Sequence, residues 1–338
     1  MQTLVCVQPG RFEYKEAEIR KPGKGESLLR IKRIGICGTD LHAYEGTQPY
    51  FEYPRVLGHE LAGEFLEGDA EGFQPGELVT IMPYFYCGKC IACRNGKTNC
   101  CQTISVCGVH QDGGMADYFT VPSYSLLHSE GLTADALALA EPLAIGAHAV
   151  RRAAVHAGEF ALVIGAGPIG LGIMEFLKIA GASVIAMDVN TNRLNFCRNK
   201  LNIPFIIDVS SEDVIQRLGE ITNSDMPTLV IDATGNLKAI NGAFQYIAHG
   251  GRYVLVGLQK EMISFSHPAF HKREATLMSS RNATKEDFLH VIRNIKNGNI
   301  NPSNYITHRV SFGEIKDNFE SWLQPGTGVI KAMVTVDE

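Results

Sequence analysis

The 338-residue sequence predicts an α/β protein of two domains, a doubly wound parallel sheet and a more irregular β-rich domain. Short apolar runs alternate with helical patterns between residues 143 and 281, which is typical of parallel strands joined by crossover helices. Residues 1–142 instead carry short β-branched runs broken by proline and glycine. The run VIKAMVTVD predicts a strand that returns to the β-rich domain, so we assign residues 282–338 to that domain as well.

A glycine-rich turn marks the start of the parallel sheet. The run ALVIGAGPIG is a short apolar strand that ends in Gly165, Gly167 and Gly170, and a helical pattern follows it. These glycines would permit a tight turn, the approach of backbone to a pyrophosphate at a helix N-terminus, and close packing of helix on strand. The next apolar run closes on Asp188, which can accept ribose hydroxyls and would repel a 2′-phosphate. The order predicts a Rossmann domain that binds NAD, with a merely structural glycine loop as the alternative.

Further residues belong to the predicted nucleotide site. Pro168 and Ile169 open the helix after the turn, and Gly235 and Gly257 follow the fourth and fifth predicted strands. In a doubly wound sheet the cofactor binds at this carboxyl edge. Arg193 could flank the adenosine, and a solvated helix arginine is the alternative for this residue.

Charge and composition exclude several classes of protein. The net charge is −5, and no basic stripe of the kind that binds nucleic acid is visible. The N-terminus shows no basic leader, and the longest uncharged stretch, residues 160–174, is too short to span a bilayer. We therefore expect a cytoplasmic protein with neither a nucleic-acid nor a membrane partner.

Five of the nine cysteines crowd into the run YFYCGKCIACRNGKTNCC. Clustered cysteines in a reducing compartment are more often metal ligands than disulfides. Cys87, Cys90, Cys93 and Cys101 have the spacing of a closed four-thiolate shell, which suits a structural Zn²⁺. Cys100 could replace Cys101 as the fourth ligand, and buried apolar cysteines or a redox pair are the alternatives to a metal site. We call these four residues the cysteine ladder.

A second group of potential ligands lies in the motifs GICGTDLHAYEG and VLGHELAGE. Cys37 offers a thiolate, His59 an imidazole and Glu60 a carboxylate, which is a donor set for Zn²⁺ with an open position. Each residue alone has a plainer explanation as a buried cysteine, a core histidine or a surface glutamate.

These motifs together resemble the zinc-dependent medium-chain dehydrogenases, the superfamily of alcohol, sorbitol and threonine dehydrogenases. The resemblance runs along nearly the whole chain, through GICGTDLH, GHE, the cysteine ladder, DGGMADY, AEPLAIGAHA and VIGAGPIGLG. It implies a GroES-like catalytic zinc domain split around a Rossmann domain, an active site in the cleft between them, two Zn²⁺ ions per chain, and a homodimer or homotetramer.

The family's ligand roles carry over to residues of this sequence. Cys37 and His59 match two ligands of the catalytic zinc, and Glu60 matches a direct or exchanging ligand. Glu141 stands where alcohol dehydrogenases have a second cysteine, as in the polyol and sugar-acid branch. It would bind zinc directly or through water, unless it is simply an acidic residue at a helix start.

The resemblance also implies a mechanism for oxidising a secondary alcohol. Zinc would stabilise the alkoxide, which then gives its hydride to NAD. Thr39 matches the hydroxyl that relays the alcohol proton, and His42 matches the histidine that passes it to solvent, with a structural role as the alternative for His42.

The substrate class comes from resemblance to one branch. The runs GVHQDGG, FHKREATLMSSRNAT and ITHR are similar to bacterial dehydrogenases that oxidise the C5 hydroxyl of a hexonate such as L-galactonate. Arg281 and Asn282 could bind a carboxylate, and capping a strand or touching cofactor is the alternative for Arg281. Tyr50, Phe51 and His110 could line a sugar pocket, or the aromatic residues could pack within their own loop.

Three other functions stay open. The same chemistry could act on a polyol such as sorbitol or on L-threonine. A zinc-free quinone reductase of the same fold would not need Cys37, His59 or the cysteine ladder. A non-catalytic NAD- or zinc-binding protein would not need the whole set of predicted catalytic residues together.

Overall fold

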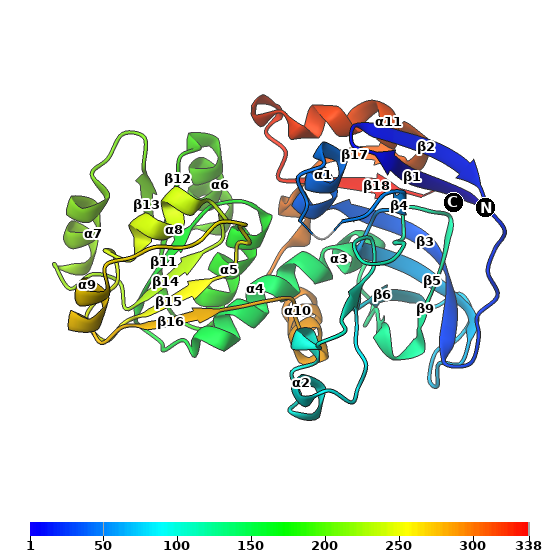
Figure 1. Ribbon diagram of the computed structural model, residues 1–338, viewed down its shortest axis with the longest axis horizontal. Coiled ribbons are helices and arrows are strands. Elements are labelled where there is room, and N and C mark those ends of the chain that lie inside the picture. Colours follow the sequence, from blue (N-terminus) through cyan, green and yellow to red (C-terminus); the bar gives the residue numbers. More distant parts are fainter. Residues whose placement is uncertain (50, 337–338) are drawn as a thin grey trace. The chain divides into compact units, whose positions relative to one another are not determined.

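The computed structural model describes residues 1–49 and 51–336. The chain divides into two compact units, Met1–Ala144 with Ala283–Glu338, and Ile145–Asn282 (Figure 1). The boundary falls within the helix α4 (Ala140–Ala153). In the described part of the chain, no helix is both long and apolar enough to cross a membrane.

The first unit is built on mostly antiparallel strands, with β17 and β18 as a parallel pair. Its largest sheet has the order β10-β6-β5-β3-β18-β17, and β9 also pairs with β3. Two smaller sheets have the orders β2-β1-β4 and β7-β8. The strands are β1 (Gln2–Gln8), β2 (Arg11–Glu16), β3 (Glu26–Ile36), β4 (Arg55–Val56), β5 (Glu60–Gly68), β6 (Leu78–Ile81), β7 (Tyr84–Phe85), β8 (Ser105–Val106), β9 (Tyr118–Pro122), β10 (Leu126–His128), β17 (Ile306–Ser311) and β18 (Lys331–Thr335).

The C-terminal strand returns to this unit, as the sequence predicts. β18 pairs antiparallel with β3, and in Figure 1 the red strand lies beside the blue one. The helices of the unit are short, apart from α10. They are α1 (Gly38–Glu45), α2 (Ile91–Arg94), α3 (Ala134–Ala138), α10 (Lys285–Lys296) and α11 (Ile315–Asn318), with the 3-10 turns η1 (Thr98–Cys100), η2 (Ser123–Ser125), η3 (Pro302–Asn304), η4 (Phe312–Glu314), η5 (Phe319–Leu323) and η6 (Pro325–Thr327).

The second unit is the predicted doubly wound domain. Its six strands are all parallel and follow the order β13-β12-β11-β14-β15-β16, which is the order of a Rossmann fold. The strands are β11 (Phe160–Ile164), β12 (Ser183–Asp188), β13 (Phe205–Asp208), β14 (Leu229–Asp232), β15 (Arg252–Leu255) and β16 (Thr276–Ser279). The helices are α5 (Pro168–Ile179), α6 (Thr191–Leu201), α7 (Val214–Thr222), α8 (Leu237–Ala243) and α9 (His267–Lys272).

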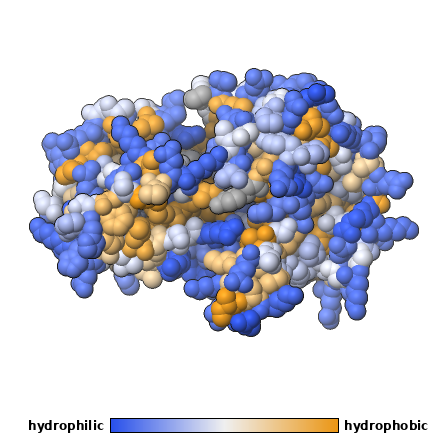
Figure 2. Space-filling view, in the orientation of Figure 1, coloured by the Kyte–Doolittle hydropathy of each residue, from blue (hydrophilic) through white to orange (hydrophobic). Residues whose placement is uncertain are grey.

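Each unit has its own apolar core. In the first, Leu29, Ile31 and Ile34 of β3 are buried with residues of neighbouring strands. In the second, Leu162 and Ile164 of β11 are buried under the crossover helices. The face shown in Figure 2 is mixed, with hydrophilic residues interrupted by several hydrophobic areas, one of which lies where Figure 1 draws α2. Two separate cores explain why the periodic pattern of the sequence changes where one unit gives way to the other.

Candidate active site

The cysteine ladder folds into a compact cluster of sulfurs. Its four donor atoms all lie within 4.8 Å of one another. The Sγ atom of Cys90 is 3.5 Å from that of Cys93 and 3.9 Å from that of Cys101, and the Sγ atoms of Cys101 and Cys87 are 3.5 Å apart. Four sulfurs around a tetrahedral zinc, each at about 2.3 Å, would be about 3.8 Å apart. The spacing therefore fits a zinc ion.

Backbone groups of the same loop donate hydrogen bonds to two of these sulfurs. The Cys87 Sγ accepts the Cys90 N–H at 3.4 Å, and the Cys101 Sγ accepts the Cys87 N–H at 3.3 Å. Hydrogen bonds from the backbone N–H groups of Lys89 and Cys90 lower the pKa of the Cys87 thiol to about 6. Cys100 is exposed and lies outside the cluster, whereas Cys101 is buried within it. The structure therefore favours Cys101 as the fourth ligand.

We expect Cys100→Ser to keep two zinc ions per chain, one for each group of donors, and Cys101→Ser to keep one. A serine hydroxyl stays protonated at neutral pH and is a poor replacement for a thiolate ligand. Elemental analysis of the two purified variants measures this. If only the Cys100 variant lost a zinc ion, Cys100 and not Cys101 would be the fourth ligand.

Cys37, His59 and Glu60 come together as the second group of donors. One ligand atom from each residue lies within 4.8 Å of the other two. Cys37 precedes α1 as its N-cap, and Glu60 begins β5 directly after His59. The structure thus brings Cys37 and His59, which are 22 positions apart in the sequence, to one place in the first unit.

Asp40 holds this group together, although its role was not predicted from the sequence. Its Oδ2 accepts the N–H of Cys37 at 2.9 Å, and its Oδ1 accepts the N–H of Gly58 at 3.2 Å. The same Oδ1 lies 3.8 Å from Nδ1 of His59. Asp40 thus joins the start of α1 to the backbone just before His59, and its charge lies close to the imidazole. In the sequence, the acidic residue of the GTD motif was the signal that could have indicated this role.

Lys331 was also missed, because it lies 271 positions along the chain from its partner. Its Nζ donates to both carboxylate oxygens of Glu60 at 2.6 Å and to the carbonyl of Ile36 at 3.1 Å. Gly35 pairs with Glu60 across the sheet, and a Cβ at Gly35 would lie 2.1 Å from Oε2 of the glutamate. Glycine is therefore required there to make room for the buried ion pair.

Glu141 lies near the second group but outside its close set of donor atoms. It is the second residue of α4, and its Oε1 accepts a hydrogen bond from the buried hydroxyl of Tyr84. Burial raises the pKa of Glu141 to about 7, although the neighbouring His59 lowers it. Burial, together with the charge of Glu141, raises the pKa of Tyr84 well above its usual value, so this phenol stays a donor.

The charges around His59 fit a bound cation. Asp40 and Glu60 are fully buried and Glu141 is only 5% exposed, while Lys331 is the partner of just one of these acids. Burial would lower the pKa of His59, but Asp40, the Cys37 thiolate and Glu141 raise it well above its usual value. Buried negative charge needs a counter-charge, and a divalent cation on the thiolate and imidazole would provide it. These residues therefore fit zinc.

The two predicted proton-relay residues follow Cys37 on the same short helix. Thr39 is half-buried and His42 is exposed, and both belong to α1. Residues three apart lie on the same side of a helix, so the two side chains are neighbours along α1. The arrangement is compatible with a path from the metal group towards solvent.

The second unit assembles the predicted nucleotide site. Gly165 has φ +98° after β11, and a Cβ at Gly170 would lie 1.8 Å from the carbonyl oxygen of Gly165, so both must be glycine. Gly167 is the N-cap of α5, with Pro168 and Ile169 as its first helical residues. Gly235 and Gly257 touch at the ends of β14 and β15, where a Cβ on Gly257 would lie 2.1 Å from the Gly235 nitrogen.

Asp188 and Arg193 flank the glycine turn. Asp188 ends β12, and its carboxylate accepts the N–H of Ala166 at 2.6 Å and that of Asn190 at 2.8 Å. A Cβ on Gly167 would lie 3.9 Å from Nη1 of Arg193, so this side chain reaches the turn. Asp188 thus also shapes the turn, a role that the sequence alone did not reveal.

The predicted substrate residues are spread over both units. Arg281 and Asn282 belong to the second unit, and Asn282 has φ +51°. Phe51 packs edge-on against Tyr53 with ring centroids 4.7 Å apart, which matches the loop-packing alternative. His110 Nδ1 accepts the N–H of Val106 at 3.1 Å and anchors its own turn. Tyr50 lies outside the described residues.

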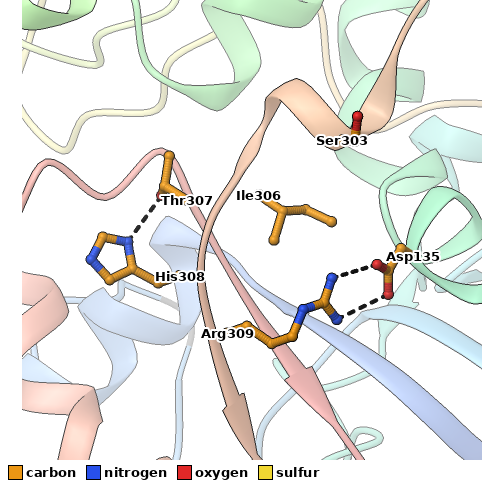
Figure 3. A pocket seen from close by; sticks show the side chains of 6 residues that line it. All are labelled: Asp135, Ser303, Ile306, Thr307, His308 and Arg309. Carbon is orange, nitrogen blue, oxygen red and sulfur yellow. Dashed lines mark hydrogen bonds and ion pairs between the residues drawn. The ribbon is translucent and has the colours of Figure 1, made fainter.

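A separate pocket of about 210 Å³ lies in the first unit beside the ITHR motif (Figure 3). Arg309 donates to both oxygens of Asp135, and Nδ1 of His308 lies 3.0 Å from Oγ1 of Thr307. None of the residues that line this pocket belongs to either group of metal donors. The pocket is therefore not the metal site.

The chain belongs to the zinc-binding dehydrogenases. Residues 23–130 match the alcohol dehydrogenase GroES-like domain, and residues 168–297 match the zinc-binding dehydrogenase family. The family membership, the GroES-like and Rossmann folds and the oxidoreductase class predicted from the sequence are thereby confirmed. The two groups of metal donors agree with a zinc-binding family.

Particular relatives are similar over nearly the whole chain. L-galactonate-5-dehydrogenase of Escherichia coli is 45% identical over 337 residues, which is 99% of each chain. An alcohol dehydrogenase of Escherichia coli solved with NADH is 30% identical, with a TM-score of 0.92 and 99% of each chain covered. The structure of L-idonate 5-dehydrogenase of Escherichia coli is 25% identical, with a TM-score of 0.89, 99% of this chain and 97% of that chain covered.

Proposed function

We propose that the protein oxidises a secondary alcohol of a sugar acid to the ketone, with zinc and NAD as cofactors and an L-galactonate-like hexonate as substrate. The observation that carries the proposal is the 45% identity to L-galactonate-5-dehydrogenase over 99% of the chain, together with the Cys37, His59 and Glu60 group. The similarity to L-idonate 5-dehydrogenase supports the same substrate class, a hexonate oxidised at C5.

The residues of the first unit would hold the metal and transfer the proton of the alcohol. Zinc bound there would supply the positive charge that lowers the pKa of the substrate hydroxyl, and bound NAD would be the hydride acceptor. Cys37 and His59 would hold the ion, while Asp40 fixes the backbone at Cys37 and at Gly58, next to His59. Thr39 would take the hydroxyl proton and His42 would release it to solvent.

The residues of the second unit would hold the dinucleotide. The α5 N-terminus at Gly167 carries the positive end of a helix dipole and free N–H groups, which suit a pyrophosphate. Asp188 would accept the ribose hydroxyls and disfavour NADP. The metal-binding and dinucleotide-binding residues lie in different units. This supports the proposal that residues 1–142 and 282–338 form the catalytic zinc domain and residues 143–281 the NAD-binding domain.

A substrate panel tests the proposed function. We expect the zinc-loaded protein to reduce NAD with L-galactonate at a kcat/KM at least tenfold above that with sorbitol or L-threonine, and to use NADP far less well. The measurement is the initial rate of NADH formation with each substrate. If the protein oxidised only sorbitol or only L-threonine, the proposed sugar-acid substrate would be wrong, and the protein would be a polyol dehydrogenase or a threonine dehydrogenase.

The zinc content per chain, together with the substrate panel, tests two other functions, a zinc-free quinone reductase and a non-catalytic binding protein. A quinone reductase without zinc would contain less than one ion per chain, while a non-catalytic binding protein would contain zinc but turn over none of the panel. The expected homodimer or homotetramer, the cytoplasmic location and the lack of nucleic-acid and membrane partners stay predictions.

A further inference from the structure

Tyr84 is a buried tyrosine that none of the sequence motifs singles out. It lies on β7 opposite Val106 of β8, and its side chain is among the buried core. Its ring packs edge-on against Phe288 of α10, with centroids 6.2 Å apart. Strand pairing on one side and an aromatic contact on another fix the direction in which its hydroxyl points. That hydroxyl donates to Oε1 of Glu141.

The two carboxylates near His59 differ in how they are held. Both oxygens of Glu60 accept hydrogen bonds from Lys331 at 2.6 Å. Glu141 instead is held at one oxygen, Oε1, which accepts the hydroxyl of Tyr84. A carboxylate held at one oxygen by a rigid donor cannot rotate freely, and its second oxygen then has a defined direction.

We propose that Tyr84 is a positioning residue that fixes Glu141 beside His59, so that the metal affinity of the second group of donors depends on the Tyr84 hydroxyl. The proposal rests on the proposed function, because it assumes that these residues hold the catalytic metal.

The variant Tyr84→Phe tests this proposal, because it removes the hydroxyl and keeps the ring that packs on Phe288. We expect a 10- to 100-fold loss of cobalt(II) affinity at the second group, which is the usual effect of losing a hydrogen bond to a metal ligand. The cobalt(II) is titrated into protein that keeps zinc on the cysteine ladder. The visible spectrum of the bound cobalt should change, and kcat should fall while the Kd for NAD stays constant.

Two further variants make the test specific. Tyr86→Phe removes a hydroxyl from the same segment, and it should leave cobalt affinity and spectrum unchanged. Glu141→Gln should lower cobalt affinity by itself, and adding Tyr84→Phe to it should have little further effect, because the two residues act as one unit. Equal losses in both backgrounds would show that Tyr84 does not act through Glu141.

Cobalt affinity and spectrum within twofold of the unmodified protein would overturn the proposal for Tyr84. This readout does not depend on the identity of the substrate. If the unmodified protein binds cobalt but oxidises no hexonate, the proposed substrate fails, and the comparison of affinities still decides the role of Tyr84.

Discussion

Replacing Cys37 with serine is expected to lower kcat/KM by about a thousandfold or more, while the protein stays folded and binds NAD as before. A metal that stabilises developing charge contributes several kcal/mol, and each 1.4 kcal/mol is about tenfold in rate. Serine should keep the fold, because Cys37 is the N-cap of α1 and serine is among the preferred residues at that position.

The rate of NADH formation with the substrate found in the panel measures this effect. Titration of NAD reports the second unit separately. Cys100→Ser is the matched control, since it makes the same chemical change at an exposed position outside both metal groups. Unchanged turnover of the Cys37 variant would place the catalytic metal elsewhere.

Replacing Lys331 with methionine is expected to lower the free energy of unfolding of the first unit by about 3 to 5 kcal/mol. Removing one partner of a buried ion pair leaves the other charge buried without compensation, and losses of about this size follow. The side chains of Lys331 and Glu60 are 2% and 0% exposed, so water cannot take over the role of the lysine. Methionine keeps most of the volume of the aliphatic chain, which separates the loss of charge from a cavity.

Urea unfolding of metal-free protein measures this loss, because a bound cation would offer Glu60 a second counter-charge. Trp322 is the one tryptophan of the chain and is buried in the first unit, so its fluorescence follows that unit. The double variant with Glu60→Gln should regain part of the lost stability, since no buried charge then lacks a partner. Lys316→Met, at an exposed position of α11, is the control and should change the free energy of unfolding by less than about 0.5 kcal/mol. An unchanged midpoint for Lys331→Met would mean that the ion pair contributes little.

Local features of the fold could be predicted from the sequence. The strand, glycine turn and helix around Gly165 are consecutive in the chain, and the apolar period changes visibly from one element to the next. The cysteine ladder is also local, because its four ligands lie within fifteen residues and their spacing sets how the loop can close. For such features the neighbours in space are also neighbours in sequence.

The surroundings of the second metal group could not be predicted in this way. Lys331 meets Glu60 because β3 pairs with β5 on one side and with β18 on the other, and this register depends on the packing of the whole sheet. Tyr84 meets Glu141 across 57 positions, through a short strand and the start of a helix. Neither contact leaves a periodic pattern in the sequence.

The sequence by itself thus determined the residue types that bind metal and dinucleotide, since ligand chemistry and turn geometry depend on short motifs. Only the tertiary structure decided which partner each buried acid has. Asp40 faces His59, Glu60 is paired with Lys331, and Glu141 is held by Tyr84. The physical reason is that a buried charge is stable only beside a compensating group, and long-range strand pairing determines which side chain lies there.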